Sequence, residues 1–98
     1  GIGGRVGSVV GEKLCGLTTG HQVLVVTHLA QLAGYADRHY RVVKRVAGGR
    51  TLTEIVPLDA EGERIEELAA MLGTPNDSGR QSARDLLAEA AGYKTARG

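Results

Sequence analysis

One short apolar run constrains the fold of this chain more than any other feature. Gln22 leads into Val-Leu-Val-Val at residues 23–26, and the run ends at Thr27 and His28. An uninterrupted run of this kind is typical of a strand buried on both faces, as in a parallel sheet covered by helices. We therefore predict an α/β fold in which residues 22–28 form a buried strand and the turn that follows it.

Helical patterns flank this run on the N-terminal side and directly after it. Apolar residues at steps of three and four predict an amphipathic helix that Thr18-Thr19-Gly20 ends. Its apolar positions are Ile2, Val6, Val9, Val10, Leu14 and Leu17. Residues 29–36 predict a second, shorter helix with its alanines and leucines facing inward.

The second half of the chain predicts a hairpin and two more helices. Two β-rich segments around Gly48-Gly49 predict a β-hairpin over residues 39–56. Residues 59–92 predict two helices, the first capped by Asp59 and stopped by Gly73. The second is predicted to open with a capping box formed by Ser78 and Gln81, and to end at Gly92, with a frayed tail beyond it. Both ends of this helix are predicted from residue spacing and turn chemistry.

Composition excludes several classes of protein. The 98 residues suffice for one small core, and a net charge of +1 identifies no partner. Cys15 is the single cysteine, so the chain has no disulfide framework, and it is predicted to pack as a small apolar side chain. The three aromatic residues are all tyrosines, which excludes an aromatic platform for single-stranded nucleic acid. No segment resembles a signal peptide or a spanning helix, so no membrane partner is expected.

His28 is the candidate functional residue, because it directly follows the predicted buried strand. In open α/β sheets ligands bind beyond the carboxyl ends of the strands, where a neutral imidazole could donate to a phosphate oxygen. The alternative is a histidine that only ends the strand and caps the next helix. The position of His28 favours neither interpretation over the other.

Other catalytic and metal-binding patterns are absent from the sequence. The phosphate-binding pattern G-x-x-x-x-G-K-[ST] does not occur, and the Gly-Glu-Lys at residues 11–13 lies within a helical pattern. No serine or cysteine lies in a nucleophile-elbow sequence. No metal site is expected, because none of the available soft ligands has a metal-binding spacing. Those ligands are Cys15, His21, His28 and His39.

The predicted hairpin carries a local basic cluster. Its members are Arg41, Lys44, Arg45 and Arg50. Such a cluster could contact a phosphate backbone. It is more often a solvated hairpin face, balanced in this chain by an acidic helix. That helix carries Glu61, Glu63, Glu66 and Glu67.

Two motifs together resemble a known family. Gly-Ile-Gly-Gly at residues 1–4 precedes, by about one helix, the string Thr-His-Leu-Ala-Gln-Leu-Ala at residues 27–33. With residues 37–40 and the segment 65–73, they resemble the C-terminal part of the ATPase head in the RecN family of bacterial DNA repair proteins. These are SMC-like, ABC-type ATPases with a P-loop fold, and the resemblance covers nearly the whole chain.

The resemblance implies a role for individual residues. His28 matches the switch histidine (H-loop) that contacts the ATP γ-phosphate, with Thr27 beside it. Gly1, Gly3 and Gly4 match the end of the D-loop, which meets a second ATPase head across ATP. In the complete protein the resemblance implies ATP and Mg²⁺ as cofactors, and as partners the rest of the chain, a second head in a homodimer, and DNA. It also implies a cytoplasmic location at the nucleoid and a role in double-strand-break repair and recombination.

The departures from the family pattern lead to competing hypotheses. Without a Walker A loop, a Walker B acidic pair or an ABC signature, these residues alone are expected to bind no cofactor and to be inactive. A second hypothesis is a freestanding α/β adaptor, which predicts a complete core and no exposed apolar sheet edge. The fragment hypothesis predicts that residues 23–26 lack neighbouring strands. A third candidate is an ATPase lobe from a recombination or transport relative, which would share His28.

Overall fold

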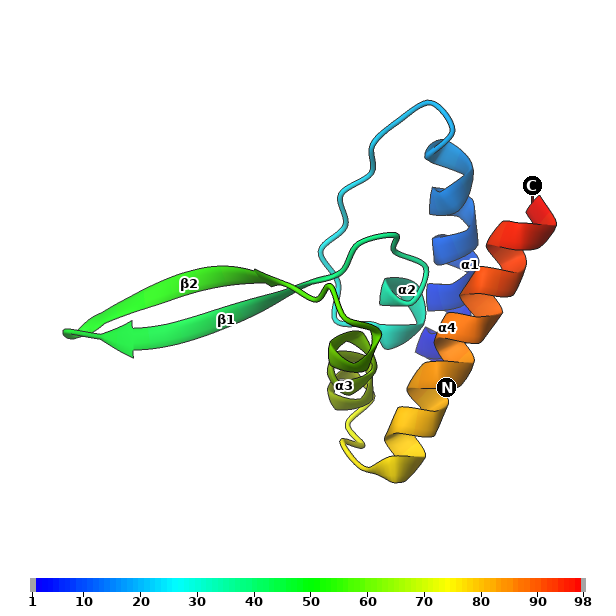
Figure 1. Cartoon of the computed structure of the whole chain (residues 1–98). Coiled ribbons are helices and arrows are strands. Elements are labelled where there is room, and N and C mark those ends of the chain that lie inside the picture. The colour runs from blue at the N-terminus through cyan, green and yellow to red at the C-terminus, as the bar shows by residue number, and fades with distance from the viewer. Residues whose placement is uncertain (1, 98) are drawn as a thin grey trace.

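The computed structural model describes residues 2–97, with side chains from Arg5 onward. Its elements are α1 (Ile2–Leu17), α2 (Ala30–Ala33), β1 (Tyr40–Ala47), β2 (Arg50–Pro57), α3 (Glu61–Met71) and α4 (Asp77–Arg97). The helices gather at one end of the molecule, and the hairpin of β1 and β2 projects away from them (Figure 1). The mixed helix and strand content, with a hairpin followed by two helices, was predicted, whereas residues 2–97 contain no parallel sheet of an α/β fold.

The predicted buried strand over residues 22–28 is not formed in this structure. The segment has no regular secondary structure, and Leu24 and Val26 are 88% and 92% exposed. A strand needs a neighbour to pair its backbone groups. The two strands that residues 2–97 contain pair only with each other. The run is therefore an extended, exposed connection between α1 and α2, as the fragment hypothesis predicts.

The buried face of α1 differs from the predicted one. Val6 and Val9 of the apolar stripe are about half exposed, whereas Gly7, Gly11 and Cys15 are buried. A Cβ atom on Gly11 would lie 2.6 Å from the Tyr35 ring, so this helix packs through the face formed by Gly7, Gly11 and Cys15. Apolar spacing thus located the helix correctly but assigned its buried face wrongly.

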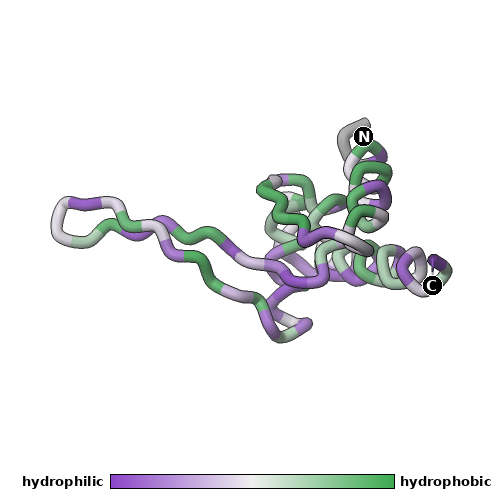
Figure 2. The backbone as a smooth tube through the Cα atoms, turned by 90° about the horizontal axis from the view of Figure 1, so that it is seen from above, coloured by the Kyte–Doolittle hydropathy of each residue, from purple (hydrophilic) through white to green (hydrophobic). Residues whose placement is uncertain are grey.

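The hairpin has the predicted two-residue turn. Gly48 and Gly49 have φ angles of +59° and +76°, which a type I′ turn requires at both central positions. Tyr40 pairs with Pro57 and Ala47 with Arg50, in antiparallel register. Polar and apolar residues are mixed along both strands in Figure 2, where the hairpin extends beyond the helices.

Helix ends in the second half differ from the predicted caps. Ala60, not Asp59, precedes α3, and its N–H donates to the Glu63 carboxylate. Asn76 replaces the predicted Ser78 capping box, because its Oδ1 accepts the Gly79 N–H at 2.9 Å. Gly73 does end α3, with a φ of +79° and the two reversed hydrogen bonds of a Schellman motif.

Helix α4 does not end at Gly92 but continues to Arg97. The predicted frayed tail is tied back to the chain instead. Lys94 pairs with Asp37 at 2.8 Å, and Arg97 donates to Thr19. Neither α4 nor any other helix within residues 2–97 is long and apolar enough to cross a membrane.

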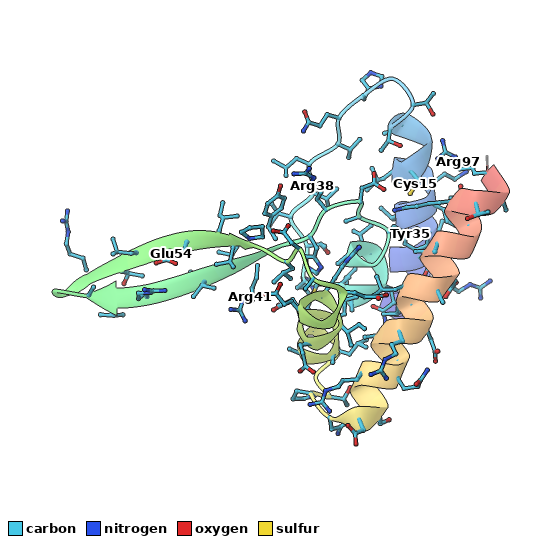
Figure 3. The ribbon with its side chains drawn as sticks, viewed as in Figure 1. Cys15, Tyr35, Arg38, Arg41, Glu54 and Arg97 are labelled. Atoms are coloured by element: carbon cyan, nitrogen blue, oxygen red, sulfur yellow. The ribbon has the colours of Figure 1, made fainter. Side chains whose placement is uncertain are left out.

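Two small hydrophobic clusters hold the helices together. One joins α2, α3 and α4 around Leu68, the largest side chain that is fully buried. The other lies between α1 and α4, where Cys15 and Tyr35 meet Ala90 and Tyr93 (Figure 3). The tyrosine rings pack edge to face with centroids 6.0 Å apart. Cys15 thus packs as a small apolar side chain, as predicted.

Candidate functional site

His28 lies on an exposed bend between the extended run and α2. Its two chain neighbours are joined by a hydrogen bond, since the Thr27 hydroxyl oxygen accepts the Leu29 N–H at 3.0 Å. Leu29 has an extended backbone and supplies no side-chain cap to α2. Thr27 therefore orders the backbone locally, and His28 is exposed to solvent.

Helix α1 packs directly on the helix that follows His28. A Cβ atom on Gly7 would lie 3.2 Å from the Gln31 Cβ and 3.3 Å from the Leu32 backbone nitrogen. A Cβ atom at position 7 would require α2 to move by a few tenths of an ångström. Gly3 and Gly4 lie in the first turn of the same helix, and Gly1 lies outside the described residues. The structure thus brings the helix that carries two of the predicted glycines against the helix next to His28.

Arg64 holds the other end of α2. Its Nη2 atom donates to the carbonyl oxygens of Ala33 at 3.2 Å, Gly34 at 3.3 Å and Ala36 at 2.6 Å. These carbonyls lie at and just after the end of the short helix, where intrahelical donors run out. The Ala33 carbonyl also accepts the Ala36 N–H at 3.1 Å. Sequence reasoning missed Arg64. The available signal was that it is the single basic residue of the otherwise acidic α3.

A hollow of about 720 Å³ lies at the base of the hairpin, between α3 and α4. It is lined by His39 and Arg64, together with carboxylates such as Asp37 and Asp59, and not by His28. Within residues 2–97, His39 Nδ1 and Arg64 Nε are buried without a hydrogen-bond partner. Because acidic and basic side chains both line this hollow, it has no preference for an anion or a cation. His28, the predicted site residue, lies elsewhere.

We expect His39 to make the stability of the chain depend on pH. Burial, followed by the positive charge of Arg64, lowers the pKa of His39 below the ordinary value of 6.5, while Glu67 opposes the shift. The unfolded chain therefore binds the proton more readily than the folded chain. We expect the free energy of unfolding to be at its full value above pH 6.5 and to fall as the pH drops below 6.5.

Urea unfolding at pH 7.5 and pH 5.5 measures this effect. His39→Gln should reduce the difference in unfolding midpoint between the two pH values. The matched control, His21→Gln in the exposed connection, should keep the difference of the parent chain. A pH dependence that is the same in all three chains would show that His39 has no part in it.

The basic cluster of the hairpin is partly neutralised by acidic side chains. Arg45 pairs with Glu54 across the hairpin at 3.2 Å, and Arg41 lies 3.9 Å from Glu67 of α3 (Figure 3). The acidic helix thus does balance one cation of the hairpin. Contact with nucleic acid stays a prediction. Within residues 2–97, no three His, Cys, Asp or Glu side chains come together as a metal-binding group.

The described fold defines a mixed helix-and-strand segment in which an unpaired apolar run ends at an exposed histidine. No protein-family model matches the chain. It is 47% identical over 89 residues to the DNA repair protein RecN of Deinococcus radiodurans, covering 90% of the chain and 16% of that relative. With RecN of Bacillus subtilis it shares 36% identity over 97 residues, covering 97% of the chain and 17% of the relative.

A third relative supports the same assignment. The chain is 51% identical over 73 residues to the DNA repair protein RecN of Xylella fastidiosa, covering 74% of the chain and 13% of that relative. The chain belongs to the RecN family and corresponds to a segment of such a protein. It spans between 13% and 17% of the length of these three curated relatives. The resemblance predicted from the motifs is thereby confirmed.

Proposed function

We propose that this chain is part of the ATPase head of a RecN-like DNA repair protein and supplies the switch histidine, His28, to an ATP site. Residues outside this chain complete that site. The observation that carries the proposal is the setting of His28. It is exposed at the end of an apolar run that lacks a neighbouring strand, and Thr27 orders the backbone on both sides of it.

The chemistry of phosphoryl transfer suits a residue in this position. Catalysis depends mainly on positioning and on donors that stabilise charge on the transferred phosphoryl group. An exposed imidazole on an ordered backbone turn can donate one hydrogen bond to a phosphate oxygen. His28 would therefore orient and stabilise the γ-phosphate, while other parts of the protein hold the remaining phosphates.

Mg²⁺ does not fit the residues of this chain. No cluster of carboxylates suited to it occurs within residues 2–97, and the sequence has no Walker A loop. No step through the metal is assigned to these residues. The same proposal includes four further expectations from the family resemblance. They are the match of Gly1, Gly3 and Gly4 to the D-loop, a second ATPase head in a homodimer, association with DNA, and a location at the nucleoid.

Substitution of His28 in the full-length protein that contains this chain tests the proposal. We expect His28→Ala to lower ATP turnover about a hundredfold, because one preorganised donor to the transition state is lost. The exposed position implies that the fold is unaffected, which circular dichroism can check. The readout is phosphate release at saturating ATP.

The matched control is His21→Ala, which replaces another exposed histidine of the same connection. Its turnover should equal that of the parent protein. Unchanged turnover in His28→Ala would exclude the switch-histidine role. That result would favour the second candidate, a segment in which His28 only ends an extended run.

A further inference from the structure

We propose that Arg64 is a positioning residue for His28 and acts through α2. The proposal rests on the function proposed above for His28. It concerns a residue of α3 that does not approach the imidazole itself. Its guanidinium instead holds the carbonyl end of the helix whose opposite end begins beside His28.

A continuous set of hydrogen bonds links the two residues. Arg64 donates to the Ala33 carbonyl, and the Ala33 N–H donates to the Leu29 carbonyl at 3.0 Å. The Leu29 N–H in turn donates to the Thr27 hydroxyl at 3.0 Å. His28 lies between Thr27 and Leu29, so the backbone on both sides of it belongs to this set.

Helix α2 depends on outside contacts for its position. It has four residues, Ala30–Ala33, and a helix of that length does not hold itself together in water. Its buried alanines pack in the cluster around Leu68, the α1 backbone lies against it at Gly7, and the guanidinium of Arg64 bonds to its carbonyl end. Arg64 is the support that carries charge-assisted hydrogen bonds, which are stronger than neutral ones.

The position of the reacting groups decides how much this support contributes. A misplacement of about 1 Å, caused by a change far from the chemistry, can lower a rate about a hundredfold. Loss of Arg64 removes the charged donor shared by the carbonyls of Ala33, Gly34 and Ala36, at and just after the end of α2, and lets the helix shift. The bend that carries His28 then shifts with it, while the groups that bind ATP elsewhere remain in place.

The test uses ATP hydrolysis by the full-length protein that contains this chain. Arg64→Met retains the apolar stem and removes the donors. We expect it to lower kcat about tenfold to a hundredfold while KM for ATP changes less than about threefold. Arg64→Lys retains a charged donor without the planar guanidinium, and its kcat should lie between those of the parent and Arg64→Met. If the Met variant does not fold, the Lys variant gives the same comparison.

Arg80→Met is the matched control, because Arg80 joins α4 to Glu66 of α3 through an exposed ion pair and does not contact α2. Its kcat should stay within about twofold of the parent. In a His28→Ala background, Arg64→Met should lower turnover less than about twofold further, because both changes remove the same contribution.

The outcomes separate the two proposals. If His28→Ala lowers turnover but Arg64→Met does not, the positioning role of Arg64 is excluded and the function of His28 stands. If the losses from the two substitutions multiply, or KM rises as much as kcat falls, Arg64 supports the fold and does not position His28. If His28→Ala leaves turnover unchanged, the proposed function itself fails.

Discussion

Replacing Leu68 with alanine is expected to lower the free energy of unfolding of this chain by about 3–5 kcal/mol. Leu68 has no exposed surface and lies at the meeting point of α2, α3 and α4. The other fully enclosed members of its cluster are alanines, which cannot grow to fill the space left behind. The free-energy cost of the lost burial and that of the cavity therefore add. Urea unfolding followed by circular dichroism measures the change.

Leu24→Ala is the matched control for this substitution. It removes the same atoms from a side chain that is 88% exposed, so it should change the free energy of unfolding by less than about 0.5 kcal/mol. Equal midpoints for Leu68→Ala and the parent chain would contradict the placement of the core. A large loss from Leu24→Ala would show that the extended run is packed in solution.

The second large effect is expected at Gly79, in the first turn of α4. A Cβ atom there would collide with the Thr74 backbone carbonyl, and Asn76 holds the Gly79 backbone in place through its cap. Backbone cannot yield as a flexible side chain can, so Gly79→Ala should destabilise the chain by about 3 kcal/mol. The unfolding midpoint in urea is the measurement.

Gly92→Ala provides a control of opposite sign on the same helix. A Cβ atom at Gly92 meets nothing within 4 Å, and the residue lies inside α4. Alanine restricts the unfolded chain more than glycine does, which should stabilise the protein by about 0.5–1 kcal/mol. Shifts of the same sign for both variants would contradict the close approach of Gly79 to Thr74.

Local rules predicted most of the elements in this chain. Hydrophobic spacing located α1 and α3, and Gly48-Gly49 located the hairpin, because turn chemistry and side-chain period act over a few residues. The predictions of the helix ends were less accurate. Asn76 was not predicted as a cap, and Gly92 was wrongly predicted as a stop. Contacts of the tail with distant residues, such as Lys94 with Asp37, extend the helix past the glycine.

The candidate site was only partly predictable. The motif around His28 is local, and the sequence shows it directly. Arg64 is 31 residues from Ala33, the first carbonyl that it holds, and no spacing rule connects the two. The packing of Gly7 against Gln31 likewise joins residues far apart in the chain. Such contacts depend on how the elements meet, which no local pattern encodes.

The apolar run at residues 22–28 shows the division between the two levels. Sequence alone located this apolar run and its end at His28, because the run and the residues that bound it are consecutive in the chain. Whether it becomes a buried strand depends on a neighbour that can pair with its backbone, and residues 2–97 provide none. In the same way, sequence determined that α1 is a helix, whereas tertiary structure decided that it packs through glycines. The approach of α2 to Gly7 and of Tyr35 to Gly11 leaves little room for a side chain at either position of α1.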